Sequence, residues 1–241
     1  MKDTERVWEK EIRAPKGVYL VDFEINPFST ALAVIDMQKY GCCRNIGLGP
    51  LFLKEAPDTA EYWFSRLSEV AIPNIRNLLQ FFRKNKLRVI YICVGPLLPD
   101  ASDMFRRRRL KDESRLKVSG IDHFFYPGTQ EHEVVDELKP ESGEMIFNKN
   151  TASPFNSTNI DQILRNMQIE SLVITGMATS ACVETTARDA ADRGYNCIIV
   201  EDGCADKFPD SHKMTMINFT RLFGKVSTTQ EVIALLESKI R

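Results

Sequence analysis

Three residues of different chemical type could together form a nucleophilic site: Cys182, Asp36 and Lys149. Cys182 comes shortly after the apolar run Ser171–Met177, in what we predict to be the first turn of a helix capped by Thr179 or Ser180. The helix dipole and unpaired N–H groups there are expected to lower the pKa of the thiol, and a nearby lysine would lower it further. The alternative is a buried, inert cysteine.

Asp36 and Lys149 each follow an apolar run. A carboxylate that emerges from a buried strand is costly unless it is paired or used, so Asp36 is either a functional group or the salt-bridge partner or cap of a loop. Lys149 alone could equally be an exposed lysine at a strand end. None of the three histidines lies at a predicted strand end. We therefore assign proton transfer to Asp36, with Lys149 as its electrostatic partner.

Apolar runs alternate with segments of helical periodicity from Thr30 onward. The runs are continuously apolar, which is typical of strands covered on both faces, and the alternation predicts an α/β, three-layer, Rossmann-like fold with a parallel sheet. Predicted strands are 31–37, 89–94, 143–148, 171–177, 197–202 and 225–227; predicted helices are 68–86, 161–167, 181–193, 210–223 and 229–238. Because ligands bind at the carboxyl ends of parallel strands, the three candidate residues are expected to converge there.

The remaining segments have less regular patterns. Residues 1–29 are interpreted as an N-terminal extension to a single domain at 30–241, residues 41–66 as a loop insertion and residues 95–129 as irregular. The basic run Arg106–Arg109 is interpreted as a solvated surface, with anion binding as the alternative.

Composition narrows the possible functions. The 241 residues are 43% hydrophobic and 27% charged with a formal net charge of −1, which gives no reason to expect nucleic-acid or membrane binding. No apolar stretch is long enough for a membrane span, and the charged first residues do not resemble a signal peptide. The six cysteines include no CxxC pair, so we expect reduced thiols and a cytoplasmic location.

Three motifs, in order, carry a resemblance to a known family. They are TALAVIDMQ, GEMIFNKNTASPF and LVITGMATSACVETTARDAADRGYNCIIVEDGC, and they resemble the isochorismatase-like cysteine hydrolases from about Thr30 onward. The resemblance implies six parallel strands and a Cys-Asp-Lys triad at Cys182, Asp36 and Lys149. It also implies a cis peptide bond between Met177 and Ala178.

Further expectations follow from this resemblance. The N–H groups of Ala178 and Cys182 would form an oxyanion hole. Gln38, Tyr40, Phe155 and Phe208 are candidate substrate-binding residues because they lie beside the triad positions or, for Phe208, after the fifth predicted strand. Arg106–Arg109 and Lys207 are candidates for binding a substrate carboxylate. No D-x-H follows Asp36, so we predict neither a catalytic metal nor another cofactor.

The resemblance is greatest to amidohydrolases of ureido compounds, namely ureidoacrylate amidohydrolase, biuret hydrolase and N-carbamoylsarcosine amidase. It implies hydrolysis of a C–N amide or ureido bond of a small-molecule substrate, through a thioester and with release of ammonia, by a homodimer or homotetramer. Alternatives are another small carboxamide as substrate, or a non-catalytic binding module on the same fold. Dinucleotide binding is disfavoured because D-M-Q-K-Y-G lacks a glycine-rich turn.

Overall fold

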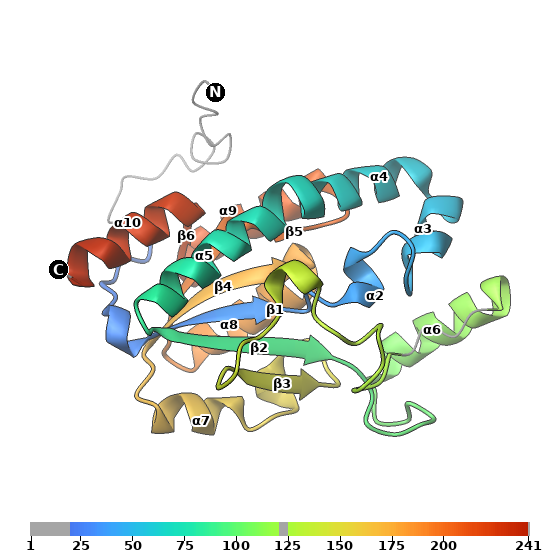
Figure 1. Ribbon diagram of the computed structural model, residues 1–241, viewed down its shortest axis with the longest axis horizontal. Helices are drawn as coiled ribbons and strands as arrows, with labels where there is room; N and C mark the ends of the chain where they lie inside the picture. Colours follow the sequence, from blue (N-terminus) through green and yellow to red (C-terminus); the bar gives the residue numbers. More distant parts are fainter. Residues whose placement is uncertain (1–19, 121–124, 241) are drawn as a thin grey trace.

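A computed structural model describes residues 20–120 and 125–240, and at its centre lies a six-stranded sheet (Figure 1). The strand order is β3-β2-β1-β4-β5-β6, and every neighbouring pair is parallel. The strands are β1 (Thr30–Ile35), β2 (Arg88–Val94), β3 (Met145–Lys149), β4 (Ser171–Met177), β5 (Asn196–Ala205) and β6 (Lys225–Ser227). The predicted α/β class and parallel six-stranded sheet are confirmed.

Helices cover both faces of the sheet and complete the three layers. On one face lie α5 (Ile72–Lys84) and α10 (Thr229–Ile240); on the other lie α7 (Ile160–Asn166), α8 (Glu184–Asp192) and α9 (Pro209–Leu222). Strand β1 shows why both layers are needed, because Leu32 and Val34 pack into one core and Ala33 and Ile35 into the other. Side chains of a strand point alternately to opposite faces, so an apolar run of this kind requires cover on each.

The order of the strands creates a crevice between β1 and β4. From β1 the chain adds β2 and β3 on one side and then β4, β5 and β6 on the other. Such a reversal opens a crevice at the carboxyl ends of the two central strands, where ligands bind. Gly176 permits the close approach of β4 to β1 there: its φ is +120°, and a Cβ atom would lie 2.0 Å from the Ile35 carbonyl oxygen.

The segment 41–66 is helical, so its interpretation as a loop insertion was wrong. It contains the second half of α2 (Lys39–Cys42) and all of α3 (Gly49–Glu55) and α4 (Pro57–Ser65), and α4 continues through a π-helical turn (Arg66–Ala71) into α5. Pro50 and Pro57 suggested loop, but each lies in the first turn of a helix, where the missing N–H has no consequence. Trp63 and Phe64 are buried and anchor α4 to the core.

The segment 95–129 also contains a helix that the sequence did not predict. Helix α6 (Arg106–Ser119) ends at Gly120, whose left-handed conformation (φ +69°) terminates it. Asp112 is the one fully buried residue of this helix, so there is no apolar stripe to reveal it. Figure 1 shows α6 standing away from the sheet at the end toward which the strands point.

The described part of the predicted extension packs on the domain. Ile25 is buried, Phe23 lies against the same core, and Lys225 Nζ lies 2.5 Å from Asp22 Oδ1. The extension assigned to residues 1–19 falls outside the described residues. Among the described helices, none has the length and apolar character needed to cross a bilayer.

Candidate active site

The three candidate residues meet at the carboxyl edge of the sheet. Lys149 Nζ lies 2.9 Å from Asp36 Oδ2 and 3.4 Å from Cys182 Sγ. Lys149 is the last residue of β3, Asp36 directly follows β1, and Cys182 lies in the turn after β4. Lys149 and Asp36 are buried, whereas Cys182 is partly exposed in a cavity. The arrangement presents the Cys182 sulfur and the Asp36 carboxylate to the cavity, whereas Lys149 is not among the lining residues.

Asp36 has an unusual backbone and a free acceptor. Its φ of +53° is left-handed, which is uncommon outside glycine and concentrates at functional positions. Its N–H donates to the Ile92 carbonyl oxygen at 2.7 Å, which ties the turn to β2. Lys149 occupies Oδ2, whereas buried Oδ1 has no hydrogen-bond partner among the described groups. Oδ1 is therefore available to accept a proton.

The electrostatics of Cys182 differ from the expectation. Burial, together with the Asp36 carboxylate, raises the pKa of the Cys182 thiol to about 12, and Lys149 opposes this only partly. The prediction that the pKa of Cys182 is lowered was therefore wrong. That prediction took account of the helix start and of Lys149, but not of burial or of the nearby Asp36 carboxylate, which both disfavour the thiolate. Burial opposes the charge on Lys149, but Asp36 and Cys182 outweigh it and raise the pKa of Lys149. At neutral pH the thiol keeps its proton.

The turn that carries Cys182 is held by side chains that sequence reasoning missed. The Met177–Ala178 peptide bond is cis, as the resemblance implies, and a π-helical turn (Thr179–Val183) follows it. Asp206 Oδ2 accepts a hydrogen bond from Ser180 N at 2.7 Å. His212 Nδ1 lies 2.9 Å from Thr179 Oγ1. A carboxylate directly after β5 was the available signal for Asp206.

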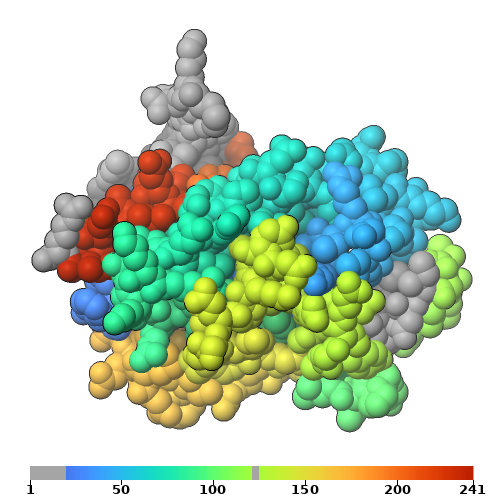
Figure 2. Space-filling model, in the orientation of Figure 1, coloured from blue at the N-terminus to red at the C-terminus, as the bar shows by residue number. Residues whose placement is uncertain are grey.

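The cavity has a volume of about 540 Å³, which suits a small molecule. Asp36 and Cys182 lie in its wall, together with Ala178 and Ala181. The other walls are largely aromatic; their rings belong to Tyr40, Phe52, Trp63, Phe64, Phe105 and Phe208. Figure 2 shows the segment around α3 and α4 beside α6 at one end of the molecule. The two segments that were misread therefore supply much of the cavity.

The four predicted substrate-binding residues separate into two pairs. Tyr40 and Phe208 line the cavity. Gln38 does not, because its amide is fully buried and bonds to both Val94 backbone groups and to the His132 carbonyl oxygen. Phe155 does not either, since it is buried beside Tyr195, at 6.0 Å between ring centroids. Gln38 and Phe155 therefore support the fold, and proximity in sequence to the triad was misleading for both.

Basic side chains line part of the cavity wall. They belong to Arg107, Arg108, Lys111 and Arg115 of α6 and to Lys207 after β5. Arg108 is 15% exposed and its Nε lies 2.5 Å from the Asp112 carboxylate, so the interpretation of Arg106–Arg109 as wholly solvated was wrong. Among the described residues, no group of three His, Cys, Asp or Glu side chains is placed to hold a metal ion, and the absence of a cofactor stays a prediction.

An open parallel sheet with an ionisable cluster at its switch point is typical of α/β enzymes that act on small molecules. The chain belongs to the isochorismatase family, since the family model described as Isochorismatase domain matches residues 30–231. It is 30% identical over 220 residues to ureidoacrylate amidohydrolase RutB of Caulobacter segnis, covering 86% of this chain and 85% of that protein. It is 36% identical over 207 residues to the protein of the same name from Enterobacter sp. strain 638, covering 85% and 88%.

Solved structures agree with this assignment. A cysteine hydrolase from Pseudomonas syringae pv. phaseolicola matches with a TM-score of 0.74 and 30% identity, covering 95% of this chain and 100% of that one. N-carbamoylsarcosine amidase from Thermoplasma acidophilum matches with a TM-score of 0.57 and 25% identity, covering 83% and 96%. The predicted family is confirmed, and the chain is a hydrolase of that family.

Proposed function

We propose that the protein hydrolyses a C–N amide or ureido bond of a small molecule through a thioester on Cys182, with release of ammonia. The observation that carries the proposal is the contact of Lys149 Nζ with both Asp36 Oδ2 and Cys182 Sγ at the cavity wall. The names of the similar proteins, which are amidohydrolases, support the choice of bond.

The first half of the reaction forms the thioester. Asp36 accepts the proton of the neutral thiol as the sulfur attacks the substrate carbonyl carbon, and the new thiolate charge develops beside the Lys149 ammonium. N–H groups of Ala178 and Cys182 stabilise the tetrahedral oxyanion, each contributing about 3–4 kcal/mol. Asp36 then returns the proton to the leaving nitrogen, the C–N bond breaks, and ammonia departs.

The second half regenerates the enzyme. Asp36, again a carboxylate, takes a proton from water as its oxygen attacks the thioester carbonyl carbon. The C–S bond breaks, the sulfur regains a proton from Asp36, and the acid product leaves. A ureido substrate would yield a carbamate, which loses carbon dioxide to give an amine. Throughout, Lys149 stays protonated and offsets whichever of Asp36 and Cys182 carries the negative charge.

An ammonia-release screen tests the proposal directly. Ureido acids, carbamoyl amino acids, biuret and simple carboxamides would be incubated with the protein and with its Cys182→Ala variant. Release by the wild type alone, together with a mass increase on Cys182 in rapidly quenched samples, is the expected result. Equal release by the alanine variant would contradict covalent catalysis, and no release from any amide would overturn the proposed function.

A further inference from the structure

The cationic wall of the cavity has more positive charge than its protein partners balance. Among the described residues, five cationic side chains line the cavity, against two carboxylates, Asp36 and Asp206. Asp36 is already paired with Lys149, and Asp206 accepts backbone hydrogen bonds from Ser180 and Lys207. The buried Asp112 pairs with both Arg108 and Arg115, so its single negative charge balances only one of their two positive charges. A surplus of positive charge therefore remains within the cavity.

Arg108 is held rigidly with unused hydrogen-bonding capacity. Its guanidinium lies over the rings of Phe125 and Tyr40, at 5.0 and 5.8 Å from their centroids. Asp112 accepts from Nε, but buried Nη2 has no hydrogen-bond partner among the described groups. A buried, unpaired guanidinium N–H is costly, and a bound anion would satisfy it.

Lys207 supplies a second, separate cation. Its Nζ lies 4.4 Å from the centroid of Phe52 and 6.0 Å from that of Trp63, and no carboxylate of the described residues forms a salt bridge with it. Burial, with repulsion from Arg115, Lys111 and Arg108, lowers the pKa of Lys207 to about 8. The neighbouring Asp206 carboxylate favours the ammonium, but burial and the three cations outweigh it.

We infer that the substrate of this cavity is a dianion, with the amide or ureido group at Cys182 and two anionic groups at Arg108 and at Lys207 with Lys111. The inference rests on the proposed function, which defines the reacting amide or ureido group, and it adds the charge of the rest of the substrate. We assign two anions rather than one because Arg108 lies over the rings of Tyr40 and Phe125, whereas Lys207 lies over those of Phe52 and Trp63. A carboxylate or phosphate meets the requirement at each position.

Three carbamoyl compounds that differ in charge form a matched test: biuret (neutral), N-carbamoyl-β-alanine (one carboxylate) and N-carbamoylaspartate (two). Binding to the Cys182→Ala variant would be measured by calorimetry, and kcat/KM would be measured with the wild type. Each added carboxylate is expected to raise affinity about tenfold, the factor that one charge-assisted hydrogen bond supplies. Raised salt should reduce the preference for the dianion.

Two variants localise the effect. Lys207→Gln should lower the affinity for the dianion more than that for biuret, whereas Lys84→Gln, an equal charge change at an exposed position of α5, should leave the ranking unchanged. Equal affinities across the three compounds, or tightest binding of biuret, would overturn the inference. If the ranking holds but none of the compounds is hydrolysed, the anion assignment stands and the proposed reaction fails.

Discussion

Lys149 Nζ lies 2.9 Å from Asp36 Oδ2, and both side chains are buried at the ends of strands that are not adjacent in the sheet. This ion pair spans β2, which separates β1 from β3. Burying two charges is favourable only when each compensates the other and their remaining atoms are used. The third partner here is Cys182 Sγ, so the pair belongs to the candidate active site as well as to the fold.

Loss of the sulfur should abolish turnover without unfolding the protein. Cys182→Ala is expected to lower kcat by at least roughly 10³-fold, because the nucleophile acts as one unit with Asp36 and Lys149. Cys43→Ala is the matched control, because Cys43 does not line the cavity. Ammonia release and thermal unfolding would be measured on both variants; an active Cys182→Ala variant, or an inactive Cys43→Ala variant, would contradict the assignment.

The raised pKa of Cys182 predicts how alkylation depends on pH. Because the thiol ionises only toward a pKa of about 12, iodoacetamide should react slowly at pH 7, and the rate should still rise steeply above pH 9. Asp36→Asn removes a charge that raises this pKa, so it should speed alkylation of Cys182 at pH 8 while blocking turnover. Mass spectrometry of the labelled peptide provides the rate, and slower labelling in Asp36→Asn would argue against this electrostatic account.

Breaking the buried pair should cost stability. Lys149→Met leaves Asp36 uncompensated and is expected to lower the free energy of unfolding by about 3–5 kcal/mol. The double variant Asp36→Asn with Lys149→Met should recover part of that loss, because neither charge then remains buried. Urea denaturation would be measured on the wild-type protein, both single variants and the double variant, because additivity is judged from all four. Additive losses in the double variant would show that the two side chains do not stabilise each other.

The raised pKa of Lys149 also gives stability a pH dependence. The folded protein retains this proton more tightly than the unfolded chain, so the contribution is fully present below the ordinary lysine pKa and is lost as pH rises through the folded value. The raised pKa of Cys182 has the same effect: its contribution to stability is lost as pH rises from the ordinary cysteine pKa to about 12. Urea midpoints should fall on the alkaline side of pH 9, and less steeply in the double variant.

Asp206 should matter through the turn it holds. Asp206→Ala removes the acceptor for the N–H groups of Ser180 and Lys207, at a cost of about 1–3 kcal/mol in stability. Since the turn carries Cys182, kcat should fall more than KM rises. Asp210→Ala, an exposed acid of the first turn of α9, is the control. An Asp206→Ala variant with unaltered kcat would show that the turn keeps its shape without this bond.

The sheet could be predicted because its strands are continuously apolar and short, and Asp36, Lys149 and Cys182 followed from their places at strand ends. The cavity walls could not be predicted in this way. Trp63 and Phe64 lie in a helix whose proline start suggested loop, and α6 has no apolar periodicity. Gln38 and Phe155 were misassigned because sequence proximity does not reveal which way a side chain points.

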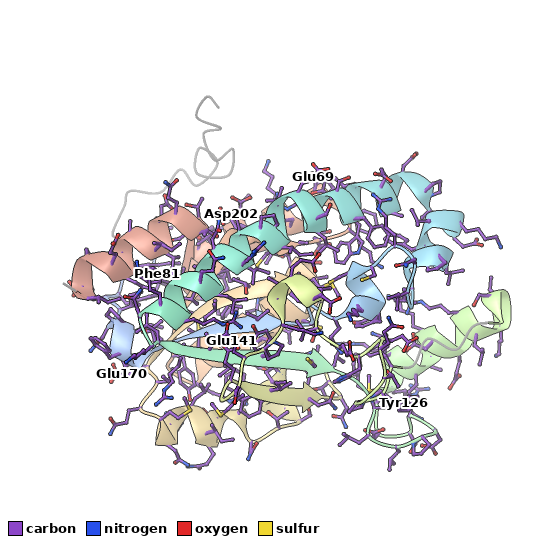
Figure 3. All side chains as sticks on the ribbon, viewed as in Figure 1. Glu69, Phe81, Tyr126, Glu141, Glu170 and Asp202 are labelled. Atoms are coloured by element: carbon purple, nitrogen blue, oxygen red, sulfur yellow. The ribbon has the colours of Figure 1, made fainter. Side chains whose placement is uncertain are left out.

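The direction of the strands is easily followed in Figure 3. Glu170, labelled just before β4, lies at the amino edge, whereas Tyr126 lies near the start of α6 at the opposite edge. The residues of the proposed chemistry all lie at the carboxyl edge of the sheet, where the strands end. The amino edge contains ordinary connections, such as the Ser29 hydroxyl bonded to Glu170 at 3.2 Å.

Helix α6 provides most of the basic wall, yet Asp112 is the one fully buried residue among its fourteen. The proposed nucleophile, Cys182, lies by contrast in the turn directly after the central strand β4. The proposed selectivity and the proposed reactivity are thus assigned to different parts of the chain. Because Arg108 of α6 packs over Tyr40 and Phe125 of the core, an enzyme engineer who wished to redirect the protein to new compounds would keep Arg108 and its partner Asp112. The charge of the helix could then be changed at Arg107 and Lys111, which line the cavity without such a contact to the core.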